Sequence, residues 1–135
     1  MKRCLTSLAL ALAAASAPCA TLKATLLEPQ DDARLERTRL ERAYLGHTGG
    51  PLADALHLAI DENQLELESA GSAVVIDTKP VATLDAARSA AIAAEKAGAA
   101  VLLTDLNAAW TLAVADAVKL PVLNLSEPAD SLRQQ

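Results

Sequence analysis

Residues 100–125, AVLLTDLNAAWTLAVADAVKLPVLNL, begin and end with apolar runs that flank a longer segment. Neither run, at 100–104 or at 121–125, alternates polar and apolar residues, which is typical of strands in a parallel sheet covered on both faces. The segment between them, 107–120, is long enough to be a helix. A strand, a helix and a second strand in this order predict a βαβ unit with parallel strands.

The sequence before this stretch repeats the same alternation. Strands are predicted at 21–27 and 73–76, and helices at 33–45, 52–70 and 84–97. Thr83 is predicted to cap the last of these helices, and Gly71 and Gly98 to end two of them. Residues 77–80, DTKP, are expected to close the second strand, and 127–135 to begin another helix. The pattern predicts an α/β fold with a doubly wound, mainly parallel sheet that is incomplete at four strands.

The first twenty residues, MKRCLTSLALALAAASAPCA, have the layout of a secretory signal peptide. Lys2 and Arg3 form the basic start, and the apolar stretch at 5–15 is too short to cross a bilayer as a mature helix. We expect cleavage after Ala20, which leaves 21–135 as the mature chain. An uncleaved anchor, or a lipid attached at Cys19, is the alternative.

Composition excludes several function classes. Both cysteines lie in the predicted signal, so the mature chain would have no disulfide, no cysteine nucleophile and no thiolate metal site. Loss of Lys2 and Arg3 leaves ten basic and seventeen acidic residues, a charge of −7, which argues against a nucleic-acid partner. The two histidines have no metal-ligand spacing, and no G-x-S-x-G elbow is present, so we expect neither a metal site nor an enzyme.

Two long stretches carry a resemblance to a known family. They are LERAYLGHTGGPLADAL at 40–56 and AAWTLAVADAVKLPVLN at 108–124. With the AIDEN segment at 59–63 and the Asp77-Thr78 pair, they resemble type I periplasmic binding proteins of the branched-chain amino-acid-like group of ABC transporters. The resemblance is greatest to the subfamily found with pyrroloquinoline quinone (PQQ)-dependent alcohol dehydrogenase systems. Because such proteins are longer and have two lobes, 21–135 is expected to be part of the N-terminal lobe.

This resemblance implies a flavodoxin-like strand order, 2-1-3-4-5, and a periplasmic solute-binding component of an ABC-type transport system. The implied ligand is PQQ or a related small molecule. The implied partners are the transporter permease or components of the PQQ-dependent dehydrogenase system. A generic branched-chain amino-acid-type receptor is the alternative, and a secreted α/β enzyme fragment is a more distant one. Asp31, Asp32 and Asp105 also suggest the acidic pocket of a phospho-receiver, but secretion argues against that function.

Ligands of open α/β sheets bind beyond the carboxyl ends of the strands, where the strand order reverses. The implied order puts this crevice between the first and third strands. Seven residues near it are candidates for ligand binding: Glu28, Tyr44, His47, Asp105, Asn107, Trp110 and Asn124. Amino-acid-binding members usually present hydroxyl groups after the third strand. The segment 105–109, DLNAA, has none, which favours a larger and flatter ligand.

The roles of several candidates stay open. Trp110 is either a core residue or a flat surface for a planar ligand. His47 lies in a glycine-containing segment, 47–50, that precedes a helix and would suit an anionic group, or it lies in a plain loop. The four arginines of the only basic cluster either meet a polycarboxylate or pair with the interleaved Glu36 and Glu41. They are Arg34, Arg37, Arg39 and Arg42.

Overall fold

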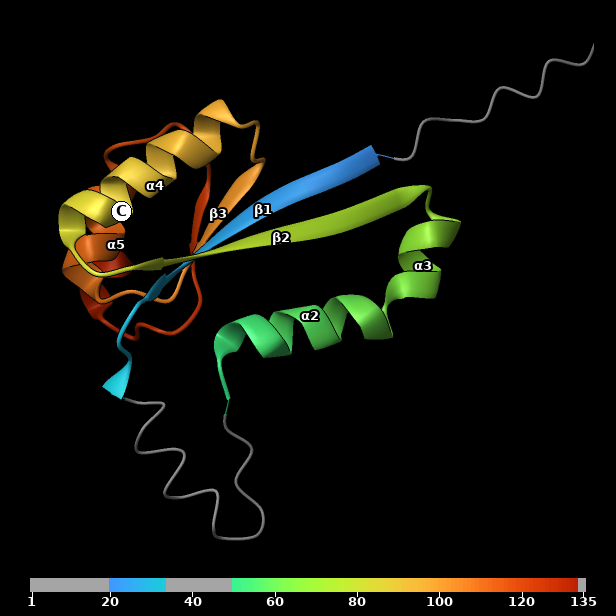
Figure 1. The fold of residues 1–135 in the computed structure, drawn as a ribbon, viewed down its shortest axis with the longest axis horizontal. Coiled ribbons are helices and arrows are strands. Elements are labelled where there is room, and N and C mark those ends of the chain that lie inside the picture. The colour runs from blue at the N-terminus through green and yellow to red at the C-terminus, as the bar shows by residue number, and fades with distance from the viewer. Residues whose placement is uncertain (1–19, 34–49, 134–135) are drawn as a thin grey trace, which may run out of the picture.

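The computed structural model describes residues 20–33 and 50–133, and these form an α/β fold around a parallel sheet (Figure 1). The strands are β1 (Ala20–Pro29), β2 (Ser72–Val81), β3 (Val101–Thr104) and β4 (Val122–Asn124). The helices are α2 (Leu52–Glu62), α3 (Gln64–Ser69), α4 (Leu84–Lys96), α5 (Ala108–Ala115) and the short 3-10 helix η1 (Asp130–Leu132). The strand order is β2-β1-β3-β4, with every neighbouring pair parallel, so the predicted fold class is confirmed.

The sheet is buried on two faces by different helices. Leu27 and Leu102 belong to a core with the buried residues of α4 and α5, whereas Leu26 and Leu103 belong to a second core that Leu52 and other residues of α2 cover. Leu26 and Leu27 are both 0% exposed, although neighbouring residues of a strand point to opposite faces. The unbroken apolar run at 100–104 reflects this double covering, whereas the prediction was wrong for the run at 121–125, in which Leu123 is 52% exposed.

Alanines on α4 allow this helix to lie close to the sheet. Ala87, Ala91 and Ala94 are its buried residues, and their spacing places them on one face of the helix. The hydroxyl of Thr83 accepts a hydrogen bond from the N–H of Ala86 at 3.1 Å, which confirms the predicted cap. Gly98 has a φ of +81°, a left-handed conformation that glycine adopts without strain, just after the end of the helix.

β2 is longer than predicted, because residues 77–80 continue the strand. β2 also begins one residue earlier, at Ser72, and continues to Val81, so the predicted strand 73–76 was too short at both ends. The carbonyl of Val81 accepts a hydrogen bond from the N–H of Gln30, which follows β1. Because the main-chain groups of successive strand residues point to alternate sides, those of Pro80 point away from β1, toward the edge of the sheet. Because the main chain of Pro80 points away from β1, and β2 is the last strand among the described residues, the missing N–H of Pro80 removes no bond within the sheet.

The predicted helix at 52–70 is two helices, α2 and α3, separated by Asn63. The side-chain amide of Asn63 donates to the carbonyl of Ala59 at 2.7 Å, and Asn63 has φ −102° and ψ 11°. A side chain that bonds to a nearby carbonyl competes with the helical ladder, so this prediction was wrong at one residue. The predicted helix at 33–45 lies almost wholly outside the described residues.

α5 is shorter than the predicted 107–120. It ends at Ala115, and Lys119 beyond it donates its backbone N–H to the carboxylate of Glu95 on α4 at 2.8 Å. This contact replaces a helical bond, and Pro121 follows two residues later. Between β4 and residue 133, the last one described, the only helical turn is η1, in place of the helix predicted from 127.

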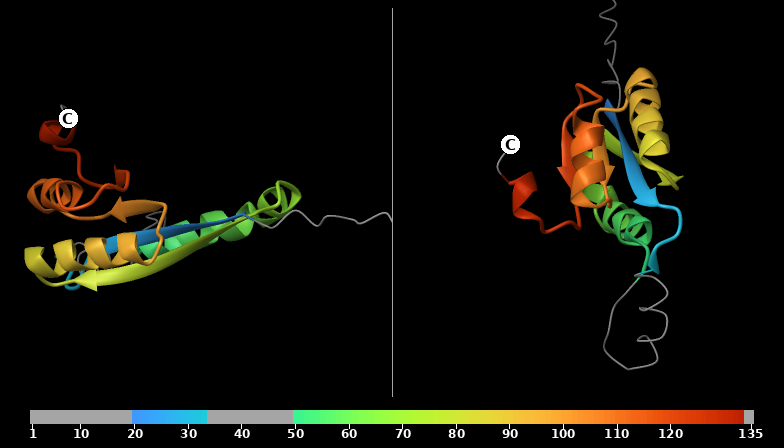
Figure 2. Two further views of the ribbon diagram at one scale, coloured as in Figure 1. Left: turned by 90° about the horizontal axis from the view of Figure 1, so that it is seen from above. Right: turned by 90° about the vertical axis from the view of Figure 1, so that its left-hand side faces the viewer.

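β1 and β2 extend beyond the rest of the sheet at their amino ends (Figure 2). β3 begins at Val101, which pairs with Ala24, so the first residues of β1 pair only with β2. α3 lies on this extended part, and contacts β2. The opposite, carboxyl ends of β1, β3 and β4 lie together and position the candidate site.

Candidate functional site

A hollow of about 470 Å³ lies at the carboxyl ends of β1, β3 and β4. Because β2 and β3 lie on opposite sides of β1, the strand order reverses between β1 and β3, which is where the sequence placed the crevice. The lining residues come from the segments that follow these strands and from the first turn of α5. They are Pro29, Asp31, Asp32, Asp105, Leu106, Asn107, Trp110, Ser126, Glu127 and Pro128.

Trp110 is both a core residue and a wall of this hollow. It packs against the core that contains Val114, and it also lines the hollow. Its position is fixed by Asn107, whose side-chain oxygen caps α5 by accepting the backbone N–H of Trp110 at 3.0 Å. The alternatives of a core residue and a ligand surface are therefore not exclusive for this side chain.

Asp105 joins the ends of three strands. It follows β3 directly and is only 7% exposed. Its backbone N–H donates to the carbonyl of Leu27 in β1 at 2.9 Å, and its carboxylate accepts a hydrogen bond from the hydroxyl of Ser126, which follows β4. Hydrogen bonds to buried carboxylates are among the stronger ones, so Asp105 holds the floor of the hollow in one geometry.

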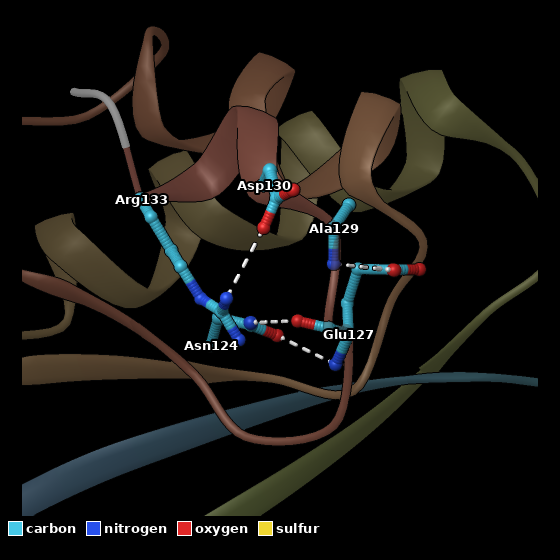
Figure 3. Close-up of polar contacts among 5 residues, drawn as sticks. All are labelled: Asn124, Glu127, Ala129, Asp130 and Arg133. Atoms are coloured by element: carbon cyan, nitrogen blue, oxygen red, sulfur yellow. Dashed lines mark hydrogen bonds and ion pairs between the residues drawn. The ribbon is translucent and has the colours of Figure 1, made fainter.

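The segment after β4 is closed by its own hydrogen bonds (Figure 3). The side-chain oxygen of Asn124 accepts the N–H of Glu127 at 3.0 Å, and its amide donates to the carbonyl of Glu127 at 2.5 Å. The carboxylate of Glu127 in turn accepts the N–H of Ala129 at 3.0 Å. Both polar atoms of Asn124 thus hold the loop that brings Ser126 and Glu127 to the hollow.

Glu28 lies beside the hollow among other carboxylates. Burial raises the pKa of this side chain, and the negative charges of Asp105, Asp32 and Asp54 raise the pKa further. Asp54 belongs to the first turn of α2, whereas Asp32 and Asp105 follow β1 and β3, so acidic groups from three segments act on Glu28. The arrangement therefore favours a proton on this group above the usual pH range of a glutamic acid.

The structure brings together three of the seven predicted site residues as lining of the hollow: Asp105, Asn107 and Trp110. Glu28 lies next to them without lining the hollow, and Asn124 holds the neighbouring loop. Tyr44, His47 and the arginine cluster lie outside the described residues. The sequence did not single out Pro29, Leu106 or Pro128, which have no reactive group and are found only once the strand ends are known.

Within residues 20–33 and 50–133, no group of three or more histidine, cysteine, aspartate or glutamate side chains is arranged to hold a metal ion. No helix in the same part of the chain has the length and apolar character needed to cross a membrane. Comparison of the chain with protein-family models, curated proteins and solved structures finds no significant match.

Proposed function

We propose that this chain forms part of a solute receptor, which holds a small molecule in the hollow at the carboxyl ends of β1, β3 and β4. The observation that carries the proposal is the position of this hollow at the reversal of strand order. Its volume of about 470 Å³ lies in the usual range of small-molecule sites, roughly 300–1,000 Å³. The indole of Trp110 supplies an apolar wall next to polar groups, which is the common composition of such sites.

The walls of the hollow are held in place by bonds within the protein. Asn107 is fixed by capping α5, Ser126 by Asp105, and Glu127 by Ala129. A site that is already ordered loses less conformational entropy when a ligand binds. This favours reversible capture over a site that forms only around its ligand.

The wider setting is part of the same proposal. The signal-like first twenty residues support export to the periplasm, and the two stretches at 40–56 and 108–124 support an ABC-type receptor of a PQQ-dependent alcohol oxidation system. In this setting the ligand is PQQ or a related small molecule. A second lobe closes over it by a hinge motion, without covalent chemistry, and the permease or dehydrogenase components receive it.

The charge of the lining favours a second candidate, an amino-acid-type receptor. Asp31 and Glu127 line the hollow and carry carboxylates, as do Asp32 and Asp105. Carboxylates attract the ammonium group of an amino acid and repel a polycarboxylate such as PQQ. The two candidates therefore differ in the charge of the ligand at the same site.

A titration of the whole chain with four compounds separates the candidates. They are PQQ, leucine, 4-methylpentanoate (leucine without its amine) and 3-methylbutylamine (leucine without its carboxylate). Trp110 is the only tryptophan, so its indole N–H gives a single signal in a ¹H–¹⁵N spectrum. A saturable shift with PQQ alone supports the PQQ system, and one with leucine alone supports the amino-acid receptor. Absence of a saturable shift with all four compounds would contradict both the PQQ candidate and the amino-acid candidate.

Two charge variants test whether a bound compound occupies the hollow. Asp31→Asn removes an exposed carboxylate from the lining, and Asp116→Asn removes an exposed carboxylate at the other end of α5. We expect the first variant to change the dissociation constant severalfold and the second to leave it unaltered. Equal effects of both variants would show that the compound binds elsewhere.

A further inference from the structure

We propose that two copies of this chain pair antiparallel along the open edge of β2, with Thr78 of one copy opposite Thr78 of the other. Within residues 20–33 and 50–133, the strand order gives β2 a neighbouring strand on one side only, and β2 is ten residues long. An edge of this length presents a row of main-chain groups that another strand can use. The proposed partner surface does not include the hollow.

Main-chain direction determines which residues of β2 face a partner. The carbonyls of Gly71 and Val81 accept hydrogen bonds from Ala20 and from Gln30, which follows β1. The odd-numbered residues of β2 therefore point their N–H and C=O groups toward β1. The even-numbered residues, among them Ile76, Thr78 and Pro80, therefore direct theirs outward. With Thr78 opposite itself, each Thr78 N–H donates to the other carbonyl, and each Ile76 N–H donates to the carbonyl of Pro80. The missing N–H of Pro80 costs only one bond per copy in this register.

The charged side chains along the edge of β2 favour this register. They also favour a second copy of the same chain as the partner. Asp77 and Lys79 lie on the same face of β2, with side chains 59% and 50% exposed and 3.0 Å apart. When Thr78 lies on the two-fold axis, Asp77 of each copy lies directly opposite Lys79 of the other. Moving the axis to residue 77 would instead place two aspartates opposite each other, which is unfavourable. The edge is thus complementary in charge to itself.

Val75 lies on the same edge strand and is 52% exposed in the single chain. In this register it lies opposite Val81 of the other copy, which is already buried in its own core at 4% exposed, so main-chain hydrogen bonds and charge pairs determine the pairing. Because the interface consists of one strand from each copy with its neighbouring side chains, we expect a dissociation constant in the micromolar range.

Sedimentation of the whole chain, from low micromolar to several hundred micromolar protein, tests the proposal. We expect a reversible equilibrium between monomer and dimer. Asp77→Lys places lysines opposite lysines, and should raise the dissociation constant roughly tenfold to a hundredfold. The double variant Asp77→Lys/Lys79→Asp restores opposite charges across the axis, and should restore the dimer.

A matched control changes the same charge away from the edge. Asp116→Lys alters an exposed side chain at the end of α5, a helix that contacts β4 at the other edge of the sheet, and should leave the dissociation constant unchanged. Circular dichroism of each variant identifies any loss of folding. A chain that stays monomeric at every concentration overturns the proposal and assigns Lys79 and Pro80 to protection of the edge against pairing. A dimer that does not respond to the charge variants also overturns it, because the contact then lies elsewhere.

Discussion

Replacement of Thr78 by valine is expected to stabilise the protein. The hydroxyl oxygen of Thr78 is buried and has no hydrogen-bond partner among the described residues. Thr78 pairs with Leu26 and therefore lies on the sheet face that α2 covers. An unsatisfied buried hydroxyl costs about 1–3 kcal/mol, and valine fills the same space with a methyl group. Taking the lower limit, we expect the free energy of unfolding to rise by about 1 kcal/mol and Tm by roughly 4 °C.

The matched control for this prediction is Thr104→Val. Thr104 is 0% exposed, and its hydroxyl donates to the carbonyl of Leu123 at 3.4 Å. The same change of side chain there removes a hydrogen bond, so the free energy of unfolding should fall by about 1 kcal/mol. Urea denaturation of both variants, at a protein concentration that keeps the chain monomeric, measures the two effects. The reasoning fails if Thr78→Val destabilises the protein, or if both variants shift the midpoint in the same direction.

Three further predictions concern the core, a helix cap and pH. Leu102→Ala should lower the free energy of unfolding by about 2–5 kcal/mol in urea titrations, because Leu102 of β3 is 0% exposed and belongs to one core with the buried alanines of α4. Thr83→Ala should cost about 1 kcal/mol in thermal melts, whereas Thr83→Ser, which keeps the hydroxyl that caps α4, should cost less. The raised pKa of Glu28 means that its contribution to stability is complete below the ordinary value of 4.5 and is lost as pH rises through the folded-state pKa. Urea midpoints across this range should therefore fall less in Glu28→Gln than in the natural chain, while Glu66→Gln on the exposed face of α3 should follow the natural chain.

Local sequence patterns predicted the buried strands well. The apolar run at 100–104 locates β3 to within one residue, since a strand covered on both faces needs apolar side chains at every position. Pro80 was misinterpreted because proline ends a strand only where its N–H would be needed. That need depends on whether the strand lies at an edge, which is a property of the whole sheet.

The sequence predicted those site residues that follow a strand whose end was predicted correctly. Asp105, Asn107 and Trp110 follow β3 closely, so a correct strand boundary brought them into the crevice. β1 continues to Pro29, two residues beyond its predicted end, and this moves Pro29 and Asp31 to the hollow. The contact of Ser126 with Asp105 joins residues 21 positions apart, and a local pattern contains no signal for it.

The helices on the two faces of the sheet differ in how deeply they are buried, and this difference implies an order of local unfolding. α4 contains three buried residues, whereas none of the residues of α2 or α3 is buried. Elements with few buried contacts exchange their amide hydrogens through local unfolding, at a lower free energy than the global transition. The α2–α3 pair should therefore detach as a unit while β1, β3 and α4 stay folded. Such opening would transiently expose Leu26 and Leu103 to solvent, and would carry the carboxylate of Asp54 away from Glu28.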